Sequence, residues 1–176
     1  MTFLISLNVQ GLGVPHKYQA LKKNLFLARP NIVFIQETMH SSRVFIAYFR
    51  KKYPSWFMVA TGENGLSGGL AVLWDPMWIK AKAFKCYAGI MISATVCGHA
   101  NILNLLNVYA PCRNRAPFWE RLFASDILDM ESLLLAGDLN ITLSPDECWG
   151  SCRKKDPLSD KIRMELLSKN LVDVIP

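Results

Sequence analysis

The chain has 176 residues, of which 51% are hydrophobic and 19% are charged, and its formal net charge is +6. This length and composition exclude an intrinsically disordered chain and suit one folded domain or part of a larger protein. No apolar run approaches the ~18 residues that cross a bilayer, and the N-terminus lacks the basic region of a signal peptide. We therefore expect no membrane contact, an intracellular location, and five cysteines that are free thiols without disulfide partners.

The charge is distributed unevenly along the chain. Residues 1–60 contain eight Lys or Arg residues and one acidic residue, Glu37, whereas residues 61–176 contain twelve basic and thirteen acidic residues. A basic segment beside a nearly neutral remainder suits a polyanionic partner such as nucleic acid. The solvated faces of two helices would carry the same charges, so charge alone leaves both interpretations open.

Hydrophobic periodicity predicts alternating strands and helices. Strands are expected at residues 3–9, 31–36, 56–60, 70–74, 79–84, 89–96, 101–109, 133–136 and 171–175. Helices are expected at residues 17–28, 42–52, 118–128 and 158–170. The apolar side of the second helix is expected to consist of Val44, Ile46, Ala47 and Tyr48. This order of elements predicts an α/β fold in which one sheet packs on another with helices outside.

The stretch from Leu133 to Asn140 is the most informative in the chain. Four apolar residues predict a strand buried on both faces, and Gly137, Asp138 and Asn140 follow it. Because Asp138 and Asn140 are two residues apart, extended backbone directs both side chains to the same side. Such a pair suits the positioning of a water molecule or the binding of a phosphate and a hard cation. Asp and Asn are also ordinary turn residues, so a simple turn explains the pair as well.

Motifs for several common chemistries are missing from the sequence. It contains no P-loop, no dinucleotide fingerprint and no hydrolase nucleophile elbow. Cys148 and Cys152 have the spacing of half a zinc site, but the other cysteines lie far apart, which argues against zinc. Polar residues at the ends of predicted strands remain as candidates, because such ends can converge on one rim of a fold. These residues are Asn8, Glu37, Tyr109, Asp138 and Asn140.

These residues and their neighbours resemble a known family. The segments concerned are Asn8 after the first strand, Gln36-Glu37-Thr38, Ser67-Gly68-Gly69-Leu70-Ala71-Val72, Asn107-Val108-Tyr109-Ala110-Pro111 and Gly137-Asp138-Leu139-Asn140. In this order they resemble the endonuclease/exonuclease/phosphatase superfamily, particularly the endonuclease domain of LINE-type (non-LTR) retrotransposons. The stretch from Ile141 to Asp160 strengthens the resemblance, which covers essentially the whole chain.

The resemblance implies a four-layer αββα sandwich and an Mg²⁺-dependent DNA endonuclease that contacts the DNA backbone. In that family pattern Glu37 binds Mg²⁺, and Asn8 helps to hold the metal or its waters. Asp138 orients or deprotonates the attacking water, while Asn140 and Tyr109 hold the scissile phosphate. One glutamate without a histidine cluster suits Mg²⁺ better than zinc.

Two features depart from the family pattern. Leu7 replaces a common Trp, and the resemblance implies a further acidic residue and a Ser-Asp-His segment beyond Pro176. On this basis we expect residues 1–176 to form a single domain that is incomplete at its C-terminus and inactive alone, cut from a protein with a reverse transcriptase and a nuclear role. A non-catalytic remnant with weak nucleic-acid binding, an abasic-site endonuclease, and a phosphomonoesterase such as a phosphoinositide phosphatase are the alternatives.

Overall fold

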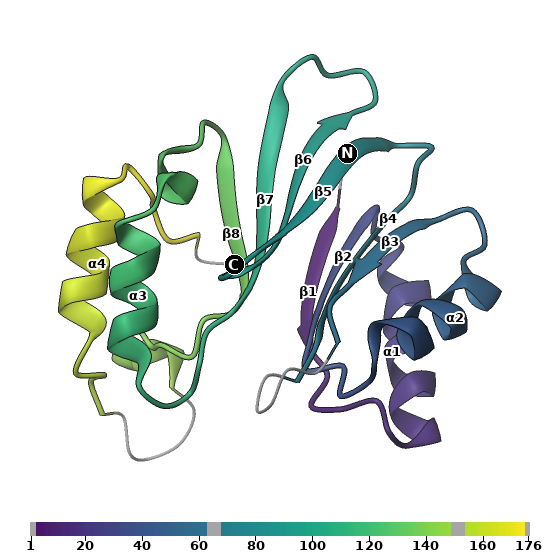
Figure 1. The fold of residues 1–176 in the computed structure, drawn as a ribbon, viewed down its shortest axis with the longest axis horizontal. Coiled ribbons are helices and arrows are strands. Elements are labelled where there is room, and N and C mark those ends of the chain that lie inside the picture. The colour runs from purple at the N-terminus through teal and green to yellow at the C-terminus, as the bar shows by residue number, and fades with distance from the viewer. Residues whose placement is uncertain (1–2, 63–67, 149–153, 175–176) are drawn as a thin grey trace. The chain divides into compact units, whose positions relative to one another are not determined.

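A computed structural model describes residues 3–62, 68–148 and 154–174 (Figure 1). The chain divides into two compact units. The first contains residues 1–109 and 131–138, and the second contains residues 110–130 and 139–176. Each unit is described by itself. Whether residues 1–176 form one domain remains a prediction.

The first unit contains a four-stranded sheet in the order β1-β2-β4-β3. Its strands are β1 (Leu4–Asn8), β2 (Ile32–Gln36), β3 (Phe57–Ala60) and β4 (Leu70–Trp74). β1 and β2 are parallel, whereas β2 pairs with β4, and β3 with β4, in antiparallel fashion. Every residue of β2 and β4 is buried, as expected for central strands that are covered on both faces.

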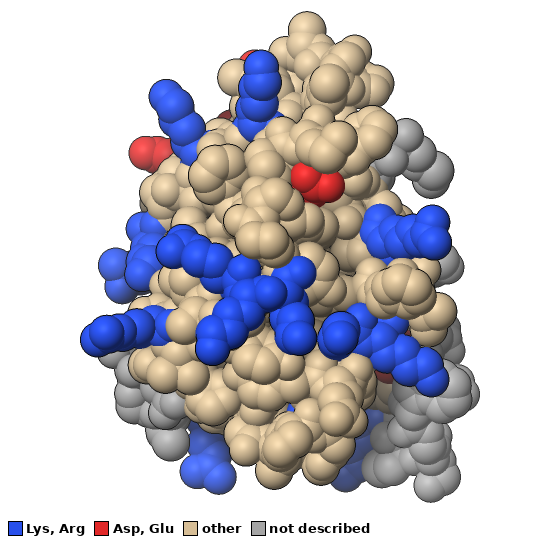
Figure 2. Space-filling model, turned by 90° about the vertical axis from the view of Figure 1, so that its right-hand side faces the viewer, with Lys and Arg blue, Asp and Glu red and all other residues tan. Residues whose placement is uncertain are grey.

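Two helices cover the outer face of this sheet (Figure 1). They are α1 (Pro15–Ala28) and α2 (Ser42–Lys52). α1 begins with a proline in its first turn. The Ser41 side chain caps α2 by accepting a hydrogen bond from the Val44 amide. The predicted apolar side of α2 is right for Ile46 and Tyr48, which are half-buried against the core, but wrong for the exposed Val44 and Ala47. Phe45 and Phe49 are the buried residues, and Val44 is 51% exposed, because two stacked phenyl rings one turn apart bury more apolar surface than Val44 could. Lys and Arg side chains gather on the outer face of these helices (Figure 2).

A second four-stranded sheet packs on the inner face of the first. Its strands, in the order β5-β6-β7-β8, are β5 (Ile79–Cys86), β6 (Gly89–Val96), β7 (Ile102–Tyr109) and β8 (Leu133–Asp138). β5, β6 and β7 are antiparallel neighbours, and β7 and β8 are parallel. Apolar side chains of both sheets, among them Phe34, Val72 and Ile90, form one core cluster. The expected α/β fold with sheet packed on sheet is confirmed.

The strand that ends in Asp138 differs from its prediction. β8 forms as expected, but its residues are half-buried rather than buried on both faces, and Leu134 is 37% exposed. Within the described residues β8 hydrogen-bonds to β7 only, so it is an edge strand of its sheet. An edge strand has a neighbour on one side only, and this explains the lower burial.

The second unit is helical. It contains α3 (Arg115–Phe123), the 3₁₀ turns η1 (Asp126–Asp129) and η2 (Pro145–Glu147), and α4 (Ser159–Ser168). The helix predicted for residues 118–128 is confirmed only as far as Phe123, because the chain becomes extended at Ser125, whose hydroxyl donates to the Leu122 carbonyl, and η1 follows. Residues 171–174 contain no strand, and Val172 and Val174 are more than 70% exposed. A strand there lacks a pairing partner among the described residues.

Cys86, Cys97, Cys112 and Cys148 are free thiols, and Cys152 lies outside the described residues. None of the described helices has the length and hydropathy of a transmembrane segment.

Candidate active site

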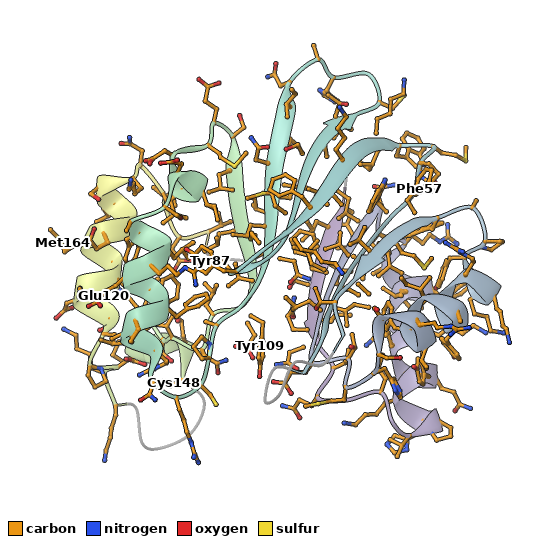
Figure 3. All side chains as sticks on the ribbon, in the orientation of Figure 1. Phe57, Tyr87, Tyr109, Glu120, Cys148 and Met164 are labelled. Carbon is orange, nitrogen blue, oxygen red and sulfur yellow. The ribbon has the colours of Figure 1, made fainter. Side chains whose placement is uncertain are left out.

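Four polar side chains meet at one end of the sandwich in the first unit. Asn8 ends β1, Glu37 follows β2, and Tyr109 and Asp138 end β7 and β8. β1 and β2 are parallel, with Asn8 opposite Gln36, and β7 and β8 are parallel, with Tyr109 opposite Asp138. The carboxyl ends of each pair therefore lie at the same edge of their sheet. Figure 3 labels Tyr109 at this end of β7.

The Asn8 side-chain amide joins the two carboxylates. Its Nδ2 donates to Glu37 Oε1 at 2.9 Å and to Asp138 Oδ2 at 2.6 Å, and its Oδ1 accepts from the Gln10 amide at 3.0 Å. The Gln10 contact fixes the orientation of the amide, because an N–H group can donate only to the oxygen. Tyr109 Oη donates to the same Glu37 Oε1 at 3.1 Å. One nitrogen thus holds Glu37 and Asp138 side by side.

Backbone conformation contributes to this geometry at two positions. Glu37 has φ of 56°, in the left-handed region that residues other than glycine seldom adopt, and such conformations concentrate at functional sites. Gly137, directly before Asp138, has φ of 137°, and a Cβ there would lie 2.1 Å from the Val108 carbonyl oxygen. Only glycine lets β8 approach β7 closely enough to place Asp138 opposite Tyr109.

A buried polar network lies beneath the site and was missed in the sequence. Gln36 is 1% exposed, and its Nε2 donates to Asn107 Oδ1 at 2.7 Å and to Ser6 Oγ at 3.0 Å. Asn107 is fully buried, and its Nδ2 donates to the carbonyls of Ala71 at 3.0 Å and Ile35 at 3.3 Å. These bonds join the two sheets directly behind Glu37 and Tyr109. Polar residues inside otherwise apolar strands were the available signal, because buried polar groups require partners.

The fifth candidate, Asn140, belongs to the second unit and is described there by itself. Its Nδ2 donates to the Ala110 carbonyl at 2.6 Å, and its own carbonyl accepts from Arg115 Nη1 at 2.7 Å. Arg115 also forms a two-pronged ion pair with Asp156, including an Nη2–Oδ1 distance of 3.0 Å. Arg115 therefore fixes the backbone at Asn140, a positioning role that sequence reasoning missed. The predicted contact of Asn140 with phosphate remains a prediction.

The chemistry of the site suits a hard cation. Two half-buried carboxylates lie beside an amide and a phenol, and all four groups carry oxygen atoms. Mg²⁺ typically binds one or two carboxylates and completes its shell with water and substrate phosphate. Across the described ranges, no group of three His, Cys, Asp or Glu side chains forms a closed metal cage. The donor set fits a divalent cation that Glu37 would bind, with Asp138 beside its waters.

The sequence profile of the "Endonuclease/Exonuclease/phosphatase family" matches residues 5–163. The chain belongs to this family. The match spans both units and includes all five candidate residues, so the family predicted from the motifs is confirmed. A search of curated protein sequences found no match.

Several solved structures share the fold. An AP endonuclease from Archaeoglobus fulgidus has a TM-score of 0.67 at 18% identity, covering 96% of this chain and 70% of that one. The endonuclease domain of TRAS1, a telomere-specific non-LTR retrotransposon, has a TM-score of 0.65 at 14% identity, covering 96% and 72%. D. rerio TDP2 complexed with a single-strand DNA product has a TM-score of 0.64 at 17% identity, covering 98% and 66%. The chain spans only 63–66% of the two D. rerio TDP2 structures.

Proposed function

We propose that the chain carries the active site of an Mg²⁺-dependent phosphodiester hydrolase that nicks DNA. The observation that supports this most directly is the single Asn8 amide nitrogen that holds both the Glu37 and Asp138 carboxylates beside the Tyr109 hydroxyl. Enzymes of this family generally depend on a divalent metal ion. A bound cation would polarise the phosphoryl oxygen and lower the pKa of a nearby water.

Each of the four residues has a distinct proposed role. Glu37 binds the cation, and Asn8 keeps the Glu37 and Asp138 carboxylates in place. Asp138 accepts a hydrogen bond or a proton from the attacking water, which aligns that water with the phosphorus. The Tyr109 hydroxyl, now bonded to Glu37, turns to donate to the scissile phosphate when substrate occupies the site. Asn140 is proposed as a further phosphate donor.

DNA is the proposed substrate for two reasons: the positive charge of residues 1–60, and the DNA bound in structures with similar folds. Residues 1–60 contain eight basic residues and one acid, which favours a polyanion. Structures with similar folds include a TDP2 bound to a DNA product and a Neisseria 3′ phosphatase bound to a product DNA hairpin. The fold of the TRAS1 endonuclease domain supports an origin in a non-LTR retrotransposon whose protein also contains a reverse transcriptase.

The proposal is tested by nicking of supercoiled plasmid in Mg²⁺ and in EDTA. The chain and a version extended with the C-terminal segment of a related endonuclease are compared, each with Asp138→Asn and Glu37→Gln. Glu131→Gln, an exposed carboxylate in the turn before β8, is the matched control. We expect the extended version to nick DNA in Mg²⁺ but not in EDTA, with activity that is about 10²–10³-fold lower in Asp138→Asn and unchanged in Glu131→Gln.

A second substrate separates the alternatives within the family. An oligonucleotide with a 3′-phosphate reports phosphomonoesterase activity under the same conditions. Release of phosphate without any nicking would replace the endonuclease assignment with that of a phosphatase. Activity that survives EDTA, or that Asp138→Asn leaves unchanged, would contradict the proposed site.

A further inference from the structure

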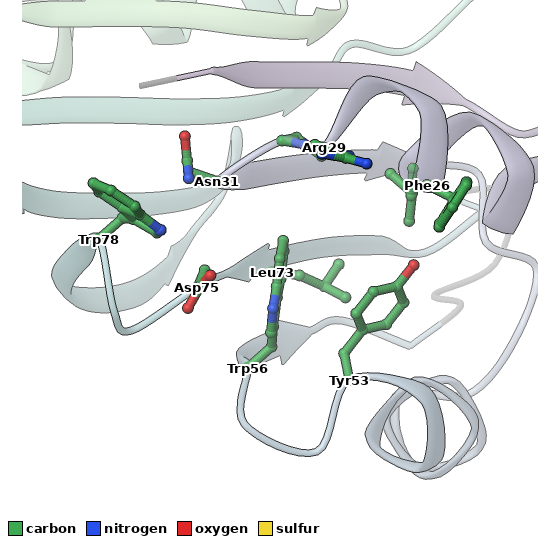
Figure 4. A pocket seen from close by; sticks show the side chains of 10 residues that line it. Phe26, Arg29, Asn31, Tyr53, Trp56, Leu73, Asp75 and Trp78 are labelled. Carbon is green, nitrogen blue, oxygen red and sulfur yellow. The ribbon is translucent and has the colours of Figure 1, made fainter. Parts of the chain in front are cut away.

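The first unit contains a pocket of about 350 Å³ that has no part in the candidate active site. Phe26 and Arg29 contribute from the end of α1, Tyr53 and Trp56 from the segment after α2, and Asp75 and Trp78 from the turn after β4 (Figure 4). Its volume lies within the range of small-molecule binding sites in proteins. The pocket is therefore large enough for one planar ring system and its substituents.

The pocket and the active site lie at opposite ends of β2. Asn31, directly before the strand, lines the pocket, whereas Glu37, directly after it, belongs to the active site. The five residues of β2 lie between them, and the extended chain from Asn31 to Glu37 spans about 20 Å. A ligand in the pocket therefore does not contact the catalytic carboxylates, and the two sites can be examined independently.

Four aromatic side chains surround the pocket and leave part of their surface to solvent. Phe26 is 69% exposed and Trp78 is 49% exposed, although neither residue is polar. Tyr53 and Trp56 are half-buried, with ring centroids 5.3 Å apart and planes inclined by 51°. Exposed aromatic faces around a concave surface are typical of sites that stack planar ligands.

The charge around the pocket favours an anionic ligand. Arg29 is exposed and forms no ion pair within the described part of the chain. Arg50, Lys51 and Lys52 end α2 directly before Tyr53, and all three are exposed. Figure 2 shows that Lys and Arg dominate this face, with few acidic side chains among them. A polyanion that follows this surface would be led to the aromatic rings.

The geometry points to a binding site for single-stranded nucleic acid, in which one unpaired base stacks among Trp56 and Trp78. Arg29 then pairs with the adjacent phosphate. Asp75 and Asn31 offer an acceptor carboxylate and an amide to the polar edge of the base. Aromatic rings interleaved with basic side chains are the usual arrangement for strands without duplex structure. This site is separate from the proposed nuclease activity and does not depend on it.

An aromatic pocket with a carboxylate also suits a methylated ammonium group. The Arg29 guanidinium, which lines the same pocket, opposes that ligand here. A second cation would be repelled by Arg29 and by the end of α2. A trimethyl-lysine peptide therefore serves as a competing probe in the test.

The test is fluorescence anisotropy in EDTA with labelled 12-mers of one sequence as single-stranded DNA, single-stranded RNA and a backbone without bases. We expect the base-bearing strands to bind at least about 5-fold more tightly than the abasic backbone. Trp78→Ala should abolish this preference, whereas Phe84→Ala, which removes an exposed aromatic outside the pocket, should retain it. Comparison of the affinities for the DNA and RNA 12-mers shows whether the site prefers deoxyribose or ribose.

Arg29→Ala tests the phosphate contact, with Arg43→Ala as a matched control on α2. Both substitutions remove one positive charge from an exposed position, but only Arg29 lines the pocket. We expect Arg29→Ala to weaken binding of the base-bearing strand more than Arg43→Ala does, while thermal melts remain unchanged. Equal affinity for base-bearing and abasic strands would overturn the proposal. So would an unchanged preference in Trp78→Ala, or selective binding of the trimethyl-lysine peptide.

Discussion

Replacement of Asn107 by leucine should destabilise the protein through a single buried amide. Asn107 is fully buried and forms three hydrogen bonds, with Gln36, Ala71 and Ile35, that join the two sheets. Leucine has a similar volume, so little packing is lost. The main effect is that the groups bonded to Asn107 lose their hydrogen-bond partner. A buried polar group left unpaired costs about 1–3 kcal/mol.

Most of this destabilisation arises from the side-chain amide of Gln36. It keeps its bond to Ser6 Oγ but loses Asn107 Oδ1, whereas the two backbone carbonyls each have a second lone pair for other bonds. We therefore expect Asn107→Leu to lower the free energy of unfolding by about 2–4 kcal/mol. Urea denaturation followed by circular dichroism measures this value, and Asn101→Leu, at an exposed position before β7, is the control.

A double-mutant cycle shows whether the amide pair itself is responsible. If Gln36 and Asn107 act through their mutual bond, the double leucine variant should lose less stability than the two single variants together, by about 1–2 kcal/mol. Additive losses would show that the two amides act independently. Asn107→Leu with wild-type stability would refute the argument that the sheets depend on this network.

Three further predictions concern packing, pH and charge. Gly137→Ala should cost about 2–5 kcal/mol in a thermal melt, because its Cβ would overlap the Val108 carbonyl. Burial is the largest single influence and would raise the pKa of Asp156, but the hydrogen bonds from Arg115, Leu158 and Thr142 and the charge of Arg115 together hold that pKa below its usual value. This pair therefore stabilises the fold above about pH 4, and the stability should be lost as pH falls through the lowered pKa, as pH-dependent urea melts would show. Binding of duplex DNA through the basic residues of segment 1–60 should be independent of sequence and weaken steeply with added salt in filter-binding titrations.

Matched variants make these three expectations testable. Gly13→Ala, where an added Cβ meets nothing within 4 Å, should leave stability nearly unchanged. Asp160 forms an exposed ion pair with Lys155, so Asp160→Asn should leave the loss of unfolding free energy at low pH unchanged. Asp156→Asn should make that loss smaller. Affinity for DNA that is constant across a salt titration would contradict the electrostatic argument.

The strand ends that form the site could be predicted because local pattern determines them. Each of Asn8, Glu37, Tyr109 and Asp138 follows an apolar run, and parallel pairing brings such ends together. The network behind them could not be predicted, because the partners of Gln36 lie 30 and 71 residues away in the chain. Only the packing of two sheets reveals which polar residues within strands face each other.

The errors in the helices have a similar cause. In α2, Val44 and Phe45 are adjacent, and periodicity alone does not say which of two overlapping apolar stripes faces the sheet. Tertiary packing selected the stripe of Phe45 and Phe49. The helix predicted for residues 118–128 ended early because a Ser125 side chain competes for the Leu122 carbonyl. Patterns of apolar residues predict the presence of a helix or strand more reliably than they predict the residue at which it ends.

The central claim is that Glu37, which Asn8 holds beside Asp138, binds one divalent cation. Titration of Mn²⁺, followed by electron paramagnetic resonance of the free ion, tests it without any catalytic turnover. We predict a single Mn²⁺ site from which Mg²⁺ displaces the bound ion. Glu37→Gln should weaken the affinity for Mn²⁺ at least tenfold. Asn8→Ala should weaken it to a smaller extent, because the two carboxylates lose their shared hydrogen-bond donor. Binding that is unchanged in Glu37→Gln would contradict the assignment of this site.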